Sequence, residues 1–209
     1  MPNWCFNHLR VTRMDEYRLE INDEKNTKKE RKELEKLVEK SKKQLKEFKK
    51  VSIVQCEGDE CSGENKTLTF EGVLPMPEDL NLEKSSNEPD EVKAQKEINI
   101  KKYGFADWYE WRCHNWGTKW NAGSSDIAED SDDELIMNFE TAWAPPEPWM
   151  EAASKMFPLL DFEMHVEEES DAFYGRCKAA FGIYWDGIQS NHWIETRDNK
   201  ELLKFLKND

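Results

Sequence analysis

The stretch that decides the fold is residues 4–12, which read Trp4-Cys5-Phe6-Asn7-His8-Leu9-Arg10-Val11-Thr12. Every second residue, from Cys5 to Val11, falls on one side of an extended chain, and the residues between them fall on the other. Alternation of this length is typical of a β-strand with one face against a core. The sequence therefore predicts a strand at residues 4–12.

A long basic amphipathic helix is predicted at residues 25–50. Its apolar stripe recurs at spacings of three and four, at Leu34, Val38, Ser41, Leu45 and Phe48. Twelve basic and five acidic residues give this segment a charge of +7, so the rest of a chain of net charge −14 carries −21. We interpret the segment as a solvated helix; the alternative is contact with a nucleic acid or an acidic partner.

The remaining periodic stretches predict an α+β fold. Alternation indicates strands at 51–56, 66–74, 135–143, 160–166 and 173–185, whereas helices are expected at 90–98, 147–156 and 199–207. The order corresponds to a ferredoxin-like split βαββαβ core with an antiparallel sheet, extended by a C-terminal hairpin or strand and a terminal helix. We expect two helices on one face of the sheet.

Residues 1–209 are expected to form a single domain that carries one large insertion, at residues 78–134. This insertion contains a tryptophan-rich segment at 104–122 and an acidic connector at 124–134. We expect the tryptophan-rich segment to pack along the edge or the open face of the sheet, because an exposed aromatic face would otherwise aggregate.

The tryptophan-rich segment is the first candidate binding surface. Four tryptophans fall between Trp108 and Trp120, and each indole is large and needs a hydrogen-bond partner when it is buried. A purely structural role in the core is one interpretation. In the other, Trp111 and Trp116 pack inside while four residues face a partner, namely Arg112, Asn115, Lys119 and Trp120.

A second candidate surface comprises Thr141 and Trp143, which lie where a strand is expected to enter a helix. Free N–H groups point outward at helix N-termini, and ligands often bind there. The alternative is a turn held by Pro145 and Pro146.

Composition limits the partners and the location of the protein. Phosphate binding needs Lys and Arg, so a charge of −14 makes nucleic acid an unexpected partner, whereas a protein with a basic surface fits, including by mimicry of nucleic-acid charge. No stretch of eighteen apolar residues or secretion signal is present, so neither a membrane partner nor export is expected. Five irregularly spaced cysteines indicate reduced thiols in the cytoplasm.

Spacing supports neither a metal nor a cofactor, and it identifies no catalytic residue. There is no Cys-x-x-Cys pair and no glycine-rich phosphate loop, and the neighbours Cys113 and His114 should point apart. An enzyme of unknown reaction stays an alternative, with a pocket at the tryptophan-rich segment where Glu110, Arg112 and His114 would converge.

Several longer motifs resemble a known family, the YubB ferredoxin-like family of small proteins carried by plasmids, prophages and phages. These motifs lie at residues 1–9, 74–77, 108–120 and 139–146, and the similarity covers most of the chain. The long basic helix and residues 78–100 depart from the pattern. The resemblance implies a ferredoxin-like domain from a mobile element, and it implies no established activity.

These observations together favour a non-enzymatic interaction protein of a mobile element, which binds and modulates a host protein with a basic surface, for example in counter-defence. An enzyme of unknown reaction and a nucleic-acid-binding module are the alternatives.

Overall fold

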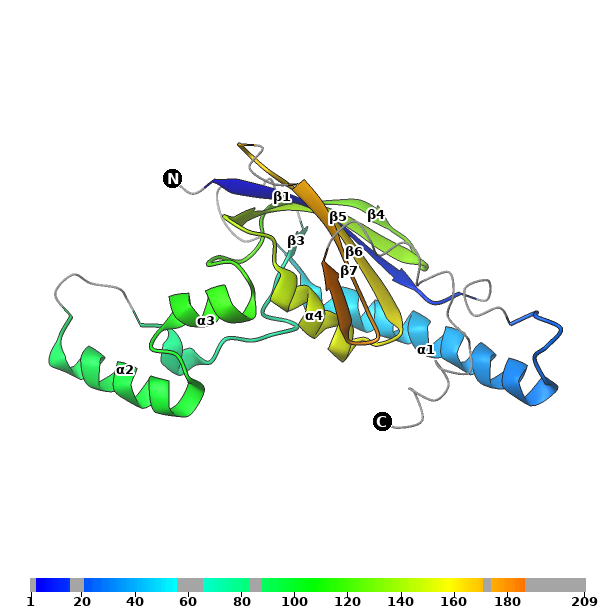
Figure 1. The fold of residues 1–209 in the computed structure, drawn as a ribbon, viewed down its shortest axis with the longest axis horizontal. Coiled ribbons are helices and arrows are strands. Elements are labelled where there is room, and N and C mark those ends of the chain that lie inside the picture. Colours follow the sequence, from blue (N-terminus) through cyan, green and yellow to red (C-terminus); the bar gives the residue numbers. More distant parts are fainter. Residues whose placement is uncertain (1–2, 16–20, 56–65, 83–87, 171–173, 187–209) are drawn as a thin grey trace.

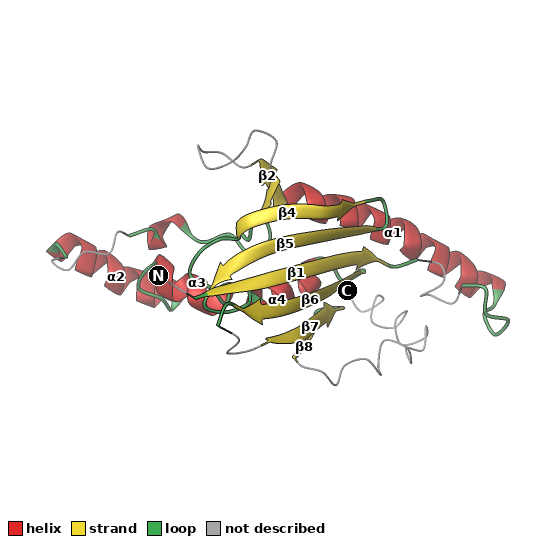
Figure 2. Cartoon of the chain, turned by 90° about the horizontal axis from the view of Figure 1, so that it is seen from above, coloured by secondary structure: helices red, strands yellow, loops and turns green. Residues whose placement is uncertain are grey.

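The computed structural model describes residues 3–15, 21–55, 66–82, 88–170 and 174–186. Six strands form one sheet in the order β4-β5-β1-β6-β7-β8, and every neighbouring pair is antiparallel (Figure 2). Their bounds are β1 Trp4–Arg13, β4 Gly123–Asp130, β5 Glu134–Ala142, β6 Leu160–Glu168, β7 Tyr174–Ala180 and β8 Ile183–Asp186.

Helices α1 (Lys28–Ser52) and α4 (Glu147–Met156) lie on the same face of this sheet (Figure 1). No helix of the described residues lies on the other face, which we call the uncovered face. The succession β1, α1, β4, β5, α4, β6 with the spatial order β4-β5-β1-β6 is the split βαββαβ arrangement. The predicted ferredoxin-like fold is therefore confirmed, including the two helices on one face. The helix predicted at 199–207 lies outside the described residues.

The core lies between the sheet and the two helices. The inward side chains of β1 are Cys5, Asn7, Leu9 and Val11, as the alternation predicts. They meet a group of interlocking aromatic rings in which Phe70 contacts Trp149 at a centroid distance of 5.0 Å and Trp116 at 5.6 Å. Large aromatic side chains thus supply much of the apolar area that a chain with 35% charged residues can bury.

Helix α1 has a complete N-terminal capping box. The Thr27 hydroxyl accepts a hydrogen bond from the Glu30 amide (3.2 Å), and the Glu30 carboxylate accepts one from the Thr27 amide (2.8 Å). The predicted stripe from Leu34 to Phe48 is buried along the whole helix. Leu45 and Phe48 join the main core, whereas Leu34, Leu37 and Val38 pack into a second cluster with Met14, Ile21, Leu159, Ala180 and Phe181.

The second strand of the ferredoxin-like core is not where the sequence analysis placed it. Residues 124–134, interpreted there as an acidic connector within the insertion 78–134, contain β4 and the turn into β5. The acidic side chains are tolerated because β4 is an exposed edge strand. Basic residues also neutralise the turn, where Lys49 contacts Asp130 (2.7 Å) and Arg13 contacts Asp133.

Residues 66–74, predicted as one long strand, divide into a short strand and a turn. Strand β3 (Lys66–Leu68) pairs with β2 (Ile53–Gln55) in a separate two-stranded sheet, and the chain then turns so that Phe70 enters the core. The predicted strand at 173–185 is also divided, into the β7–β8 hairpin with its turn at Phe181 and Gly182.

The remaining elements lie beyond one end of the sheet (Figure 1). They are the short 3₁₀ helix η1 (Glu78–Leu80), α2 (Asp90–Tyr103) and α3 (Trp108–Asn115). Helix α2 extends beyond the predicted residues 90–98, and its N-cap residue is Pro89. None of the helices that the structure describes is both long and apolar enough to cross a membrane.

Replacing Trp116 should test the aromatic core. Its side chain is fully buried and its indole N–H donates to the Leu74 carbonyl (2.9 Å), so Trp116→Ala is expected to lower the free energy of unfolding by about 3–5 kcal/mol. Trp120→Ala is the matched control, because this ring is 40% exposed and should cost far less. Denaturant unfolding measures both, and equal losses would contradict this assignment of the core.

Candidate functional site

The tryptophan-rich segment 104–122 lies at one end of the sheet rather than along its edge or its open face. Trp111 and Trp116 are buried, as predicted, and they contact each other edge to face at 5.8 Å. Thr118 donates a hydrogen bond to the Ala142 carbonyl (3.0 Å), which joins the segment to the end of β5. Burial of Trp111 and Trp116 in the core fixes the segment at this end, so Thr118 lies against the end of β5 and Trp120 against the start of β1.

At this end the structure brings together three of the predicted site residues. The Lys119 ammonium lies 3.7 Å from the centroid of the Trp120 ring and 3.8 Å from that of Trp143, within the range of a cation–π contact. Trp4, the first residue of β1, packs against Trp120 at 6.0 Å. We call Trp4, Lys119, Trp120 and Trp143 the tryptophan cluster.

Trp143 is held in an unfavourable backbone conformation. Its φ is +73°, in the left-handed region that bulky residues rarely adopt, and its side chain is 45% exposed. The surroundings hold it there, because its amide donates to the Asn3 carbonyl (2.9 Å) and the Thr141 hydroxyl donates to the Ala144 carbonyl (2.8 Å). A strained backbone that presents a large exposed ring is a common mark of a functional position.

The three other predicted site residues support the cluster or lie elsewhere. Thr141 is fully buried and also accepts a hydrogen bond from Asn7 (2.9 Å), so it holds the loop and faces no partner. Asn115 donates to the Trp111 carbonyl (2.9 Å) and ends α3. Arg112 is not the exposed charge that was expected, because it stacks over the Trp116 ring at 4.8 Å with 23% of its side chain exposed.

Burial lowers the pKa of Arg112, against the opposing effect of the Glu71 carboxylate, whose Oε1 lies 3.8 Å from the guanidinium. Because the Arg112 guanidinium covers the Trp116 ring, removing this side chain would expose the ring to water. Arg112 therefore contributes packing as well as charge to this part of the molecule.

Gly117 lets the tryptophan-rich segment approach the loop that enters α4. Its φ is +85°, and a Cβ atom there would lie 2.7 Å from Cδ of Pro148 and 3.0 Å from the Pro145 carbonyl oxygen. Only glycine fits this position without moving the loop.

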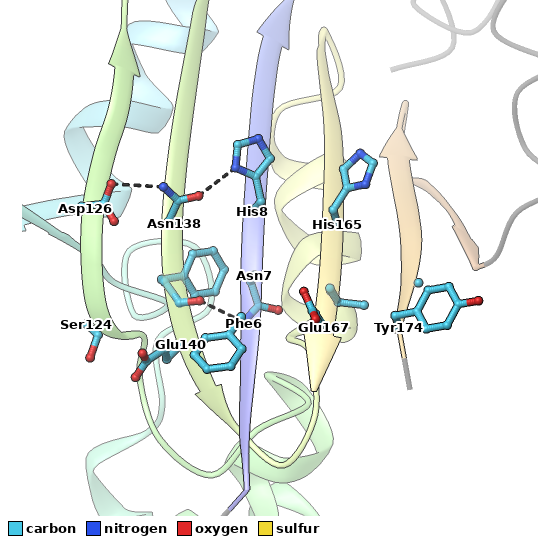
Figure 3. A pocket seen from close by; sticks show the side chains of 13 residues that line it. Phe6, Asn7, His8, Ser124, Asp126, Asn138, Glu140, His165, Glu167 and Tyr174 are labelled. Carbon is cyan, nitrogen blue, oxygen red and sulfur yellow. Dashed lines mark hydrogen bonds between the residues drawn. The ribbon is translucent and has the colours of Figure 1, made fainter. Parts of the chain in front are cut away.

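A second candidate site is a hollow of about 710 Å³ on the uncovered face of the sheet, which sequence analysis did not predict (Figure 3). Strand register arranges its outward side chains in rows that run across the strands. One row contains Glu140 of β5, Phe6 of β1, Glu167 of β6 and Tyr174 of β7. The only signal in the sequence was the outward half of the alternation at residues 4–12, where Phe6 and His8 lie among polar residues.

The next row forms a polar chain across three strands (Figure 3). The Asn138 amide donates to the Asp126 carboxylate (3.1 Å), and the Asn138 amide oxygen contacts Nδ1 of His8 at 2.7 Å. Because an amide oxygen only accepts, Nδ1 of His8 carries the proton. His165 lies opposite His8 on β6, with 6.3 Å between ring centroids.

Charges are paired farther along the same face. Glu163 on β6 contacts Arg176, Lys178 (3.7 Å) and His165 (3.1 Å). Burial raises the pKa of Glu163, but the charge of Lys178 and hydrogen bonds from His165 and Arg176 outweigh it, so this pKa lies below its usual value.

The described residues include no metal-ligand cluster, and the buried Cys5 is poorly suited to nucleophilic chemistry. They include no group of three or more His, Cys, Asp or Glu placed to hold a metal ion. Burial, the largest effect, raises the pKa of the Cys5 thiol to about 11, which makes it a poor nucleophile. Cys56 and Cys61 lie outside the described residues.

The groups proposed for an enzymatic pocket in the tryptophan-rich segment do not converge. Glu110 accepts from the Ala106 amide (2.9 Å), His114 packs on Phe105 at 5.1 Å, and Arg112 lies over Trp116.

Comparison with known proteins supports the fold. Residues 115–202 match a family model described as a ferredoxin-like domain in Api92-like protein. The chain is also similar to the crystal structure of protein api92 from Yersinia pseudotuberculosis, with a TM-score of 0.47 and 11% identity over 90% of this chain and 98% of that one. No curated protein matches the chain. The family model supports the ferredoxin-like part of the family resemblance.

The strain at Trp143 predicts an unusual order of stability. Trp143→Gly should be more stable than Trp143→Ala by about 1 kcal/mol, because glycine adopts a positive φ without the penalty that alanine keeps. At Trp120, where φ is not positive, alanine should instead be the more stable substitute. Thermal melts of the four variants give the answer, and a Trp143→Ala that matches or exceeds Trp143→Gly would refute the strain.

The lowered pKa of Glu163 predicts part of the acid sensitivity of the protein. This stabilisation is complete above the pKa that glutamate has in the unfolded chain and is lost as pH falls through the lower folded value. At pH 7, the Glu163→Gln variant should therefore be less stable than the wild type. Between pH 7 and pH 3, its free energy of unfolding should fall by less than that of the wild type. The control is Glu167→Gln, on the same strand and face; an unchanged pH profile for Glu163→Gln would contradict the assignment.

Proposed function

We propose that this chain is a non-enzymatic protein-binding module and that the tryptophan cluster is its main contact surface. The observation that carries the proposal is Trp143, whose bulky side chain is exposed at the cost of a positive φ. A tryptophan that served only the core would be buried, and a turn that served only the chain reversal would carry glycine or asparagine at this angle.

The cluster also has the composition of an interaction hot spot. Tryptophan dominates the binding energy of many protein interfaces, since it buries a large area and loses little conformational freedom. Lys119 holds the Trp120 and Trp143 rings on its two sides, so both rings are already positioned before a partner arrives. Trp4 extends this aromatic surface onto the start of β1 and toward Phe6.

Charge favours a basic protein over a nucleic acid as the partner. The hollow beside the cluster is lined by Asp126, Glu140 and Glu167 and by no Lys or Arg of the described chain. Exposed aromatics on a ferredoxin-like sheet can stack bases, but carboxylates around them repel phosphates. The same charges would attract and orient a basic protein surface.

The setting of this interaction belongs to the same proposal. The motifs that resemble the YubB family favour a plasmid- or phage-borne protein that acts in the cytoplasm of its host. Binding and modulating a host protein, for example a defence factor, is the role that this setting and the contact surface suggest.

Affinity capture from the lysate of the producing cell tests the proposal. The wild-type chain should retain a protein partner, and retention should weaken as salt rises. Trp143→Gly and Trp120→Ala should lose that partner while staying folded. The matched controls are Ile98→Ala and Ile100→Ala, which remove exposed apolar side chains from α2. Equal retention by all variants, or no specific partner, would rule the surface out.

A further inference from the structure

We propose that the hollow on the uncovered sheet face binds an arginine side chain of a basic polypeptide segment, with the guanidinium over Phe6 and between Glu140 and Glu167. This inference adds to the proposed function the side chain by which the partner would be recognised. It rests on the proposed function only in assuming that the ligand is a polypeptide.

The register places the required groups side by side. Phe6 pairs with Glu140 on one neighbouring strand and with Glu167 on the other, and all three point to the uncovered face (Figure 3). Adjacent strands are about 4.8 Å apart, so the two glutamates begin about 10 Å apart with the aromatic ring between them. Phe6 is 45% exposed, which leaves its face available for stacking.

These two carboxylates differ from the other acids of the same face. Glu163 already contacts Arg176, Lys178 and His165, and Glu134 contacts Arg10 at 2.6 Å. Within the described part of the chain, Glu140 and Glu167 have no ion pair. Asp126, the third acid of the hollow, also has no ion pair among the described residues, but its carboxylate accepts a hydrogen bond from the Asn138 amide (3.1 Å). Glu140 and Glu167 therefore place unpaired negative charge on both sides of an exposed ring.

Arginine matches this arrangement better than other cations. Its guanidinium is planar, stacks on an aromatic face and can donate to carboxylates on both sides, whereas the lysine ammonium is a compact and strongly hydrated charge. Tyr174, which pairs with Glu167 and is 81% exposed, supplies a second ring at the rim of the hollow.

The row beside this one suits the rest of a bound segment. Asp126, Asn138 and His8 form a hydrogen-bonded chain along the floor of the hollow. With Nδ1 of His8 engaged by Asn138, its Nε2 has no hydrogen-bond partner among the described residues and can contact the polypeptide backbone. The bound segment would thus contact the row of Phe6 through charge and stacking, and the row of His8 through hydrogen bonds.

Binding of a capped, fluorescently labelled hexa-arginine peptide to the purified full chain tests this site. The Glu140→Gln/Glu167→Gln variant should bind on the order of tenfold more weakly than the wild type. The matched control, Glu91→Gln/Glu97→Gln, removes the same charge from exposed positions of α2 and should change the affinity less than about twofold. Equal losses in the two variants would overturn the proposal, because the peptide would then sense only net charge.

Phe6→Leu separates stacking from charge. The wild type should prefer hexa-arginine over hexa-lysine, and Phe6→Leu should reduce that preference, since leucine keeps the apolar contact but offers no ring. An unchanged preference would contradict the stacking. Binding of a ten-nucleotide oligo-deoxythymidine that Phe6→Leu abolishes would assign the hollow to bases instead. Neither readout needs the tryptophan cluster or its partner, so this inference and the proposed function can fail separately.

Discussion

The pairing of β1 with both β5 and β6 is the constraint on which the rest of the structure depends. Because β1 lies between β5 and β6, each of its residues from Cys5 to Thr12 has a fixed neighbour on either side. The inward residues close the aromatic core, and the outward ones, Phe6 and His8, become the centres of the two rows in the hollow. A slip of one residue would exchange the two faces, so the core holds the surface pattern in place.

The sequence was a good guide wherever apolar side chains alternate or recur with a helical period. Such patterns predict the strand at residues 4–12, the stripe of α1 and the bounds of α4, and they place β5 and β6 to within about two residues. The fold class follows from the order of these elements. Strand β4 could not be found this way, because an edge strand needs no apolar face. Its last residue, Asp130, is paired with Lys49, and Asp133 in the turn that follows is paired with Arg13, and both basic residues are distant in sequence. Residues 66–74 were misleading for the converse reason, since Leu68 and Phe70 are both buried although only Leu68 belongs to a strand.

Candidate site residues were predictable by kind but not by arrangement. Lys119, Trp120 and Trp143 were chosen from two separate segments, and nothing in their spacing could have shown that the lysine lies between the two rings. Arg112 was misjudged because its charge suggested solvent, whereas its neighbouring indoles offered it a stacking surface. The hollow was not predicted, because its lining residues come from five strands and are brought together only by the register of those strands.

The division of α1 between two apolar clusters has a consequence for how the molecule opens. The helix is continuous, but its first turns are buried against Met14, Ile21 and Phe181, and its last turns against the main core. Its inner half packs on the main core beside β1, β5 and β6, whereas its outer half packs on the β7–β8 hairpin and on residues that flank β1 and β6. We therefore expect the backbone amides of this one helix to belong to two cooperative units, the outer of which reaches a partly unfolded state at lower free energy than global unfolding.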